Sequence, residues 1–324
     1  MDYKASKYLV AIQCFTYNHS KYILDALNGF VMQQTNFPYV ILIVDDASTD
    51  GEQEIIRNYI SKQFNVTDTN VAYEKETNYA HITYAQHVTN LNCYIVALYL
   101  KENHYSQRKR KLPYLSYWRD NCKYEALCEG DDYWIDPLKL QKQVDFMENN
   151  PDYSMCFHNA IKLYERLEVK DRISSFNYFK ENQQIMVEQM IEDWYIPTAS
   201  LLYRCDSLDY DSIPRFHSGD YTLELALASV GKVYYIDKYM SVYRLNNGGV
   251  SNNISANKWA NQMCELLDWY DYYTSNCYMD YINKRKKEVY KFAKYCILKQ
   301  KCILFPFLLM PFYTCKRMCN KIGI

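Results

Sequence analysis

The sequence predicts an α/β protein in which a mostly parallel sheet is flanked by helices on both faces. Apolar runs of strand length alternate with segments whose apolar residues recur at helical spacing. The runs at 39–46 and 123–128 are continuous rather than alternating, which is typical of strands buried on both faces. Glycine and proline number only 8 each among 324 residues, which argues against low-complexity disorder.

Two strand–helix pairs are predicted at the start of the chain. Residues 8–15 form a short buried strand, and residues 19–33 form a helix with its apolar residues on one face. The run at 39–46 is the second strand and ends in two aspartates. Thr49 and Glu52 have capping-box spacing, which predicts the start of a second helix.

Three further strands are predicted at 71–76, 123–128 and 153–159. Before the last of these, Asp136 suits a helix N-cap and Pro137 suits the first helical position.

Residues 93–122 show no clean period and contain the basic cluster at 108–111. We expect an insertion on the rim of the sheet there. Residues 1–254 are expected to form one domain that includes this insertion, and residues 255–324 a helical, basic and apolar C-terminal extension.

Acidic residues follow two of the predicted strands. Asp45 and Asp46 end one strand, and Glu129, Asp131 and Asp132 follow another. Parallel strands bring their carboxyl ends to one rim, where open sheets bind ligands. An isolated pair of aspartates is usually a solvated turn with a helix cap, but two facing pairs raise the cost of ionisation. A divalent cation with a diphosphate would offset this repulsion, because carboxylate oxygens suit Mg²⁺ or Mn²⁺.

Three blocks resemble the family 2 glycosyltransferases of the GT-A fold. They are FTYN at 15–18, VDDASTDG at 44–51, and EGDDYW at 129–134 followed by DPLKLQKQ. The resemblance covers roughly residues 7–251 and implies a GT-A Rossmann-like catalytic domain. It also implies a nucleoside-diphosphate sugar as donor, with Mn²⁺ or Mg²⁺ as cofactor.

The resemblance assigns roles to residues at the sheet rim. Asp46 matches the position that contacts the nucleotide base, and Phe15 and Tyr17 match positions that line the base pocket. Asp131 and Asp132 match the motif in which one carboxylate approaches the ribose and the other binds the metal, with Asp132 preferred for the metal.

Glu129 stands where many family members have a further aspartate, so its share in the site stays open.

The resemblance places the catalytic base at Asp220, which precedes an apolar helix. An aspartate there also simply favours a helix N-terminus, and His217 is a weaker candidate for the base. Asn246 stands where the family often has a histidine near the metal, and Arg244 is assigned either to the diphosphate or to a structural ion pair. The implied reaction is a single displacement that inverts the anomeric carbon.

The C-terminal extension combines many lysines with an apolar run at 302–313 that is too short to span a bilayer. This pattern favours an anionic membrane surface, the alternative being a helix packed on the catalytic domain. The start of the chain shows no signal-peptide pattern, and the 12 cysteines lack a CxxC pair. We therefore expect buried free thiols rather than disulfides or zinc ligands, and a cytoplasmic protein peripheral to the inner face of the plasma membrane.

The expected function is transfer of a sugar to a hydroxyl of a glycan or lipid-linked acceptor in cell-surface polysaccharide synthesis. A nucleotidyltransferase and a non-catalytic nucleotide-sugar-binding protein of the same fold are the alternatives. A net charge of −1 gives no support to nucleic-acid binding.

Overall fold

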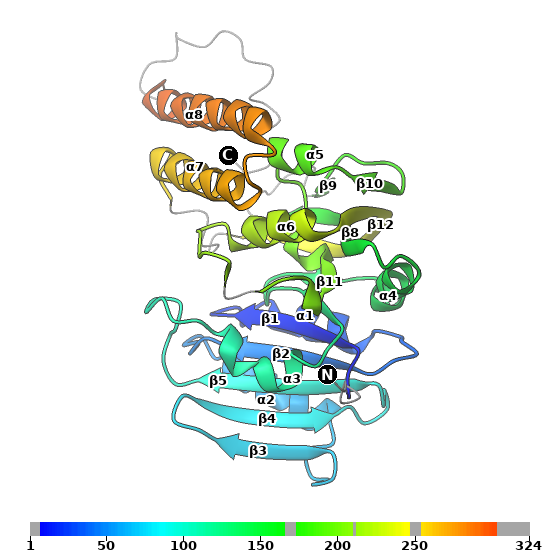
Figure 1. Cartoon of the computed structure of the whole chain (residues 1–324). Helices are drawn as coiled ribbons and strands as arrows, with labels where there is room; N and C mark the ends of the chain where they lie inside the picture. The colour runs from blue at the N-terminus through cyan, green and yellow to red at the C-terminus, as the bar shows by residue number, and fades with distance from the viewer. Residues whose placement is uncertain (1–6, 166–172, 210–211, 247–253, 303–324) are drawn as a thin grey trace.

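The computed structural model describes residues 7–165, 173–209, 212–246 and 254–302 (Figure 1). Across these residues the strands join into one sheet of twelve. The strands are β1 (Val10–Thr16), β2 (Tyr39–Asp45), β3 (Ala72–Glu76), β4 (Ala80–Gln86), β5 (Cys93–Leu100), β6 (Tyr124–Leu127), β7 (Tyr133–Trp134), β8 (Tyr153–Tyr164), β9 (Ile173–Ser175), β10 (Gln183–Ile185), β11 (Leu202–Arg204) and β12 (Lys232–Leu245).

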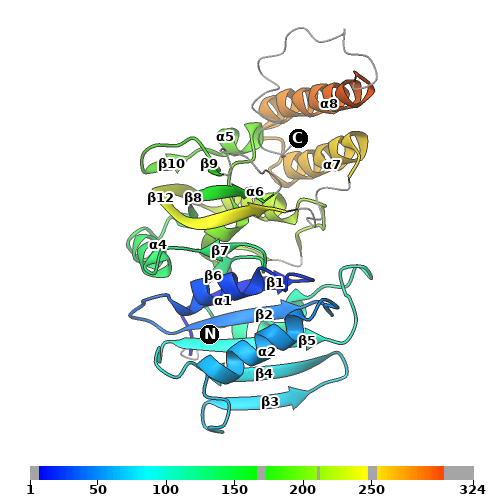
Figure 2. The same ribbon diagram turned by 180° about the vertical axis from the view of Figure 1, so that it is seen from behind.

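Helices cover both faces of this sheet. They are α1 (Ile23–Val31), α2 (Glu52–Gln63), α3 (Ser116–Arg119), α4 (Lys139–Asn149), α5 (Val187–Glu192), α6 (Gly219–Val230), α7 (Ala256–Tyr273) and α8 (Met279–Cys302), with short 3₁₀ turns η1 (Leu112–Tyr114), η2 (Thr198–Ser200) and η3 (Cys205–Ser207). Seen from opposite sides, α3 lies across one face and α2 across the other (Figures 1 and 2). Helices α7 and α8 stack together at one end of the molecule.

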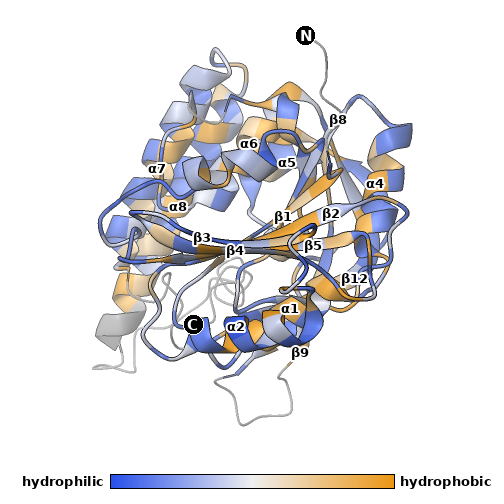
Figure 3. Ribbon diagram, turned by 90° about the horizontal axis from the view of Figure 1, so that it is seen from below, coloured by the Kyte–Doolittle hydropathy of each residue, from blue (hydrophilic) through white to orange (hydrophobic). Residues whose placement is uncertain are grey.

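The centre of the sheet is parallel, as the continuous apolar runs predicted. Its order is β10-β12-β8-β11-β6-β1-β2-β5-β4-β3, and the run from β6 to β5 is parallel throughout. Strand β11 is antiparallel to both of its neighbours, and β3 and β4 add an antiparallel edge. Hydrophobic residues gather along the strands and on the sides of the helices that face them (Figure 3). The α/β fold class is therefore confirmed, as a mixed, mostly parallel sheet flanked by helices.

Two predicted helix starts were wrong. The N-cap of α2 is Gly51, which has φ 89°, and not Thr49. No capping box forms, because the Glu52 carboxylate accepts from Thr16, His19 and Ser48, and the Thr49 amide donates to Asn18 Oδ1 (2.8 Å). Helix α4 begins at Lys139 rather than at Pro137, and its N-cap is Leu138; Asp136 Oδ1 still accepts a hydrogen bond from the Leu138 amide (2.8 Å) in the turn before the helix.

The expected insertion at 93–122 was wrong in its first eight residues. Residues 93–100 form β5, which pairs in parallel with β2 and lies inside the sheet. The apolar run CYIVALYL is a strand buried at every position except the half-buried Tyr94, but it is preceded by the antiparallel strand β4 instead of a helix. The irregular part, with η1 and α3, begins after Leu100.

The buried cysteines match the expectation of free thiols: Cys14, Cys128 and Cys156 are buried and unpaired. Cys315, Cys319 and the apolar run at 302–313 lie almost wholly outside the described residues. Among the described helices, none combines the length and apolarity that a membrane crossing requires.

A lysine is buried beneath the EGDDYW motif. Lys139, at the start of α4, has no exposed surface, and its Nζ donates a hydrogen bond to Gln143 Oε1 (2.7 Å). The same Nζ lies 4.0 Å from the centroid of the Trp134 ring. Removal from water penalises the ammonium and lowers the pKa of Lys139 to about 7.

Lys139→Met is expected to stabilise the fold at pH 7. An unfolded lysine keeps its proton up to a pKa of about 10.4. Between pH 7 and 10 the unfolded chain therefore binds more protons at this position, and the free energy of unfolding rises with pH. Methionine removes this rise and the cost of burying the amine. Urea unfolding of both proteins at pH 7, 8 and 9 should show their difference shrinking, whereas the exposed-site control Lys62→Met shows no such trend. A difference independent of pH would contradict the prediction.

Candidate active site

Three loops meet at the carboxyl edge of the central strands. Strands β2 and β6 both pair in parallel with β1. The loops that follow these three strands therefore start at the same edge of the sheet. The Asp46 amide donates to the Thr16 carbonyl (3.0 Å), and the Gly130 amide donates to the Phe15 carbonyl (3.2 Å). The expectation that the two acidic pairs reach one rim is therefore confirmed.

The loop after β1 is held by Glu52. The buried carboxylate accepts hydrogen bonds from the Thr16 hydroxyl, the His19 amide (2.9 Å) and the Ser48 hydroxyl (2.9 Å). Burial raises the pKa of Glu52, and these donors oppose the rise. The first residue of α2 thus sets the path of a loop more than thirty residues earlier.

Gly130 permits the acidic loop to touch the loop after β1. A Cβ at this position would lie 2.1 Å from Thr16 Oγ1 and 3.1 Å from His19 Nδ1. The second residue of EGDD is therefore glycine for a steric reason. Our reading of the sequence assigned it no role.

The two adjacent aspartates lie in different environments. Asp132 is 2% exposed, and its Oδ1 accepts a hydrogen bond from the Arg244 amide (2.8 Å). Burial, followed by the negative charge of Asp131, raises the pKa of Asp132. The Asp131 side chain is 17% exposed, and its Oδ2 accepts from Asn246 Nδ2 (2.8 Å) and lies 3.8 Å from His19 Nε2. Asp131 is thus the more accessible of the pair.

Glu129 and Asp220 are close enough to influence each other. Glu129 is exposed at the rim. Partial loss of hydration, followed by the negative charges of Asp131 and Asp220, raises the pKa of Glu129 to about 8. Lys111 opposes these effects. The fold therefore brings the predicted base, which follows Glu129 by 91 positions, within electrostatic reach of this rim.

Asp220 lies in the first turn of α6 and is half-buried. Its Oδ1 accepts from the Tyr221 amide (2.8 Å), and its Oδ2 accepts from Thr198 Oγ1 (3.4 Å). Burial raises the pKa of Asp220, while these donors and nearby His217 oppose the rise. His217 itself is exposed.

Asp46 is covered by the segment that sequence reasoning left without a fold. It has no exposed surface; its Oδ1 accepts from the His104 amide (2.7 Å), and its Oδ2 accepts from the Tyr105 amide (3.0 Å) and Lys111 Nζ (3.1 Å). Lys111 Nζ also lies 4.7 Å from the centroid of the Phe15 ring. In the sequence, Lys111 stood out only as a member of the basic cluster at 108–111.

Tyr17, the other predicted base-pocket residue, is 43% exposed in the loop after β1.

Arg244 is engaged by protein groups. Its side chain is 6% exposed, Nη1 donates to the Asp131 carbonyl (2.9 Å), and Nη2 pairs with Asp25. The guanidinium also lies 4.3 Å from the centroid of the Tyr133 ring. The sequence assigned Arg244 either to the diphosphate or to a structural ion pair, and this geometry supports the structural ion pair.

The donor set fits a hard cation that also binds a diphosphate. Within the described residues, no cluster of three or more His, Cys, Asp or Glu side chains is arranged to hold a metal by itself. Asp131 and Glu129 offer carboxylate oxygens at the rim. Mg²⁺ needs only one or two protein carboxylates when substrate phosphates supply other ligands.

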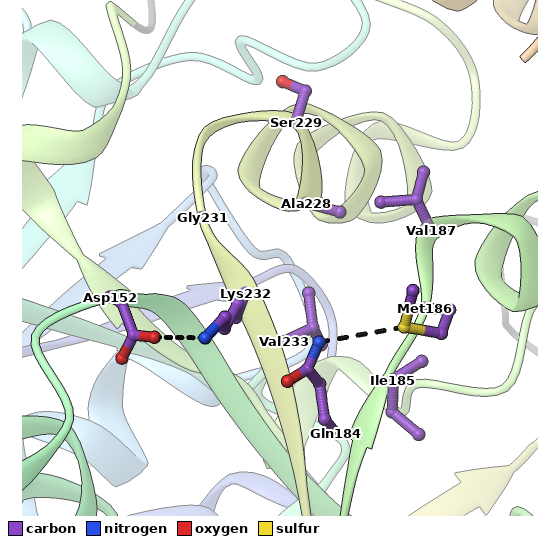
Figure 4. Close-up of a pocket in the computed structure, with 10 residues that line it drawn as sticks. All are labelled: Asp152, Gln184, Ile185, Met186, Val187, Ala228, Ser229, Gly231, Lys232 and Val233. Carbon is purple, nitrogen blue, oxygen red and sulfur yellow. Dashed lines mark hydrogen bonds and ion pairs between the residues drawn. The ribbon is translucent and has the colours of Figure 1, made fainter. Parts of the chain in front are cut away.

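A separate pocket of about 320 Å³ lies at the other end of β12, around the Asp152–Lys232 ion pair (Figure 4). Arg244 is twelve positions further along this strand, which corresponds to roughly 40 Å of extended chain. We therefore assign this pocket no part in the candidate site.

The fold and rim define a GT-A type of protein, with carboxylates gathered beyond the carboxyl ends of a mostly parallel sheet. A model of the family described as "Glycosyl transferase family 2" matches residues 14–82. The match identifies residues 14–82 as a segment of glycosyl transferase family 2.

Two relatives illustrate the likeness. An uncharacterized protein of Mycobacterium tuberculosis, Rv1520, is 31% identical over 242 residues, covering 74% of this chain and 60% of the relative. The chain thus spans about 60% of the length of the mycobacterial relatives it matches. The putative teichuronic acid biosynthesis glycosyltransferase TuaG of Bacillus subtilis is 24% identical over 256 residues, covering 78% of this chain and 84% of TuaG.

Among solved structures, the mannosyltransferase PcManGT from Pyrobaculum calidifontis, in complex with GDP-Man and Mn²⁺, has a TM-score of 0.53. The match covers 99% of this chain and 87% of PcManGT at 12% sequence identity, and it shows the shared fold.

Lys111→Met is expected to lower the free energy of unfolding by about 1–3 kcal/mol, because it removes a donor from a buried carboxylate. Lys109→Met is the matched control, since Lys109 pairs with the exposed Glu102 and such pairs contribute about 0–1 kcal/mol. Urea unfolding measures both. Equal destabilisation by the two substitutions would show that the Lys111–Asp46 contact does not hold the segment.

Proposed function

We propose that the protein transfers a sugar from a nucleoside-diphosphate sugar to a hydroxyl of a glycan or lipid-linked acceptor, with inversion at the anomeric carbon. The observation that carries this proposal is the meeting of the loops after β1, β2 and β6 at one rim, where the EGDD carboxylates lie within electrostatic reach of Asp220. The name of TuaG refers to teichuronic acid biosynthesis, which supports a role in cell-surface polymer synthesis. The GDP-Man and Mn²⁺ bound by PcManGT support a nucleotide-sugar donor.

On the donor side, Asp131 and Glu129 would hold the cation that accompanies the diphosphate. When bound, Mg²⁺ or Mn²⁺ stabilises negative charge on the departing diphosphate. The exposure of Asp131 supports it as the metal ligand in place of our first choice, Asp132. Asp132 would act as a positioning residue, because its carboxylate fastens the acidic loop to the Arg244 amide.

On the nucleotide side, Phe15 and Tyr17 would line the base pocket. Asp46 has no surface on which a base could rest, so it would act through Lys111 and the segment it anchors. The partly exposed Lys111 ammonium would then face the bound nucleotide.

On the acceptor side, Asp220 would accept the proton of the attacking hydroxyl. The two hydrogen bonds from the Tyr221 amide and Thr198 orient its carboxylate. The raised pKa makes the carboxylate a stronger base near neutral pH. No second nucleophile is required, because one displacement inverts the configuration.

A panel of UDP- and GDP-sugars with Mn²⁺ or Mg²⁺ tests the proposal. Slow release of nucleoside diphosphate is the expected result, and Asp220→Asn should reduce it by about 10²–10⁴-fold while leaving donor affinity unchanged. Asp145→Asn, at an exposed position on α4, is the matched control. Release of pyrophosphate from a nucleoside triphosphate and a sugar phosphate would favour a nucleotidyltransferase. Binding without any product would favour a nucleotide-sugar-binding protein.

We also propose that the C-terminal extension, residues 255–324, contacts an anionic membrane at its cytoplasmic face. One face of α8 packs against α5 and α7. The opposite, exposed face carries lysines at intervals of three or four residues and ends in a half-exposed leucine: Lys284, Lys287, Lys291, Lys294 and Leu298. Lys284 pairs with Glu192 (2.5 Å), and the other three lysines make no ion pair with described residues. This stripe leads toward the apolar run at 302–313.

Replacing Lys287, Lys291 and Lys294 together by Gln should weaken binding to anionic vesicles about 100-fold at low salt. Each lysine near such a surface contributes about 1 kcal/mol, and 1.4 kcal/mol corresponds to about tenfold. Flotation or sedimentation with the vesicles measures the change. The control replaces three exposed lysines on other elements, Lys62, Lys75 and Lys238. Equal binding of the two triple variants would refute the membrane proposal.

A further inference from the structure

His19 and Asp131 face each other across the rim from different loops. His19 follows β1 and Asp131 follows β6, and the distance from His19 Nε2 to Asp131 Oδ2 is 3.8 Å. Their side chains are 24% and 17% exposed, so both can be reached from solvent. The Asn246 amide holds the same Oδ2 from another side (2.8 Å).

The hydrogen bonds of the His19 ring indicate its tautomer. The Thr16 hydroxyl donates its hydrogen to Glu52 Oε1. Its oxygen must therefore accept at the contact with His19 Nδ1 (3.2 Å), which makes Nδ1 the protonated nitrogen. In the neutral ring Nε2 then carries a lone pair that is directed toward a carboxylate oxygen.

This arrangement lacks a positive group between two electron-rich atoms. A separation of 3.8 Å is too long for a hydrogen bond between them. It is shorter than two metal–ligand bonds placed end to end, about 4.2 Å. One divalent ion is therefore able to bond to both atoms, and it would offset the repulsion between them.

We propose that His19 is a ligand, through Nε2, of the divalent cation that Asp131 binds. The inference rests on the proposed function, since that function supplies the cation.

The surroundings match those of a metal-binding histidine. Such a histidine usually donates its other ring N–H to a neighbouring group, which fixes its orientation. Here Thr16 accepts that N–H and is itself held by Glu52, while Gly130 leaves room for both side chains. A nitrogen ligand also favours Mn²⁺ over Mg²⁺, because Mg²⁺ prefers oxygen ligands.

Electron spin echo envelope modulation of bound Mn²⁺ tests the proposal directly. The full-length protein is measured with Mn²⁺ alone and with Mn²⁺ plus UDP or GDP. We expect the ¹⁴N coupling of a directly bound imidazole, changed to ¹⁵N coupling by ¹⁵N-histidine labelling. His19→Gln should abolish it and weaken Mn²⁺ binding about 10–100-fold, with a smaller change for Mg²⁺. His81→Gln should preserve it, because His81 pairs with Glu74 and Glu76 on the remote edge strands.

Asp131→Asn serves as the second arm and should weaken Mn²⁺ binding without involving the imidazole. Bound Mn²⁺ with no histidine coupling in the unmodified protein would overturn the proposal, even if His19→Gln failed to fold. Coupling that persists in a folded His19→Gln protein would also overturn it. Donor hydrolysis is scored separately: turnover without coupling rejects only the role of His19, and coupling without turnover rejects only the transferase.

Discussion

The buried carboxylate of Glu52 is the interaction on which the candidate site depends. It accepts hydrogen bonds from the Thr16 and Ser48 hydroxyls and from the His19 amide, and so joins the end of β1 to the start of α2. An unpaired buried carboxylate would be costly, so the loop and the helix hold each other in one geometry. Gly130 then packs on this loop, which sets the position of the whole acidic motif.

The rim gathers more carboxyl groups than basic side chains. Lys111 lies on one side, beside Asp46, and Arg244 lies on the other, beside Asp131 and Asp132. Burial and the neighbouring carboxylates raise the pKa of Glu129 and of Asp132, while Lys111 opposes the rise at Glu129 and Arg244 opposes it at Asp132. A site of this kind favours an additional positive charge, and fixed carboxylates need little reorganisation when it arrives.

The C-terminal helices share a hydrophobic core with α6, the helix that carries the proposed base. Leu225 of α6, Tyr270 of α7 and Val289 of α8 belong to one buried cluster. Phe216, four positions before Asp220, contacts the Trp269 ring at a centroid distance of 5.8 Å. The helix that we assign to the membrane is therefore packed, through α7, against the segment that carries the proposed base. Orientation on a membrane would also orient the acceptor side of the site.

Local pattern was enough to predict much of the fold. Strands β1, β2, β6 and β8 and helices α1 and α2 follow from apolar periodicity, which is a property of neighbouring residues. The meeting of Asp46 with Asp131 at one rim followed from parallel pairing alone. Strand β5 was missed because its partner along the chain is an antiparallel strand, and the expected pattern was a helix between strands.

The sequence by itself determined which carboxylates would gather at the rim, but only the tertiary structure decided what each of them does. Asp131 and Asp132 are neighbours of the same type, and they differ because the Arg244 amide, 112 positions after Asp132, donates a hydrogen bond to the Asp132 carboxylate. The Asp46 carboxylate accepts hydrogen bonds from the backbone amides of His104 and Tyr105. Every residue type except proline has such an amide, so the sequence could not predict these partners. His19 faces Asp131 because Glu52 and Thr16 orient its ring. Such roles depend on which distant groups a side chain meets, and that is set only when the chain has folded.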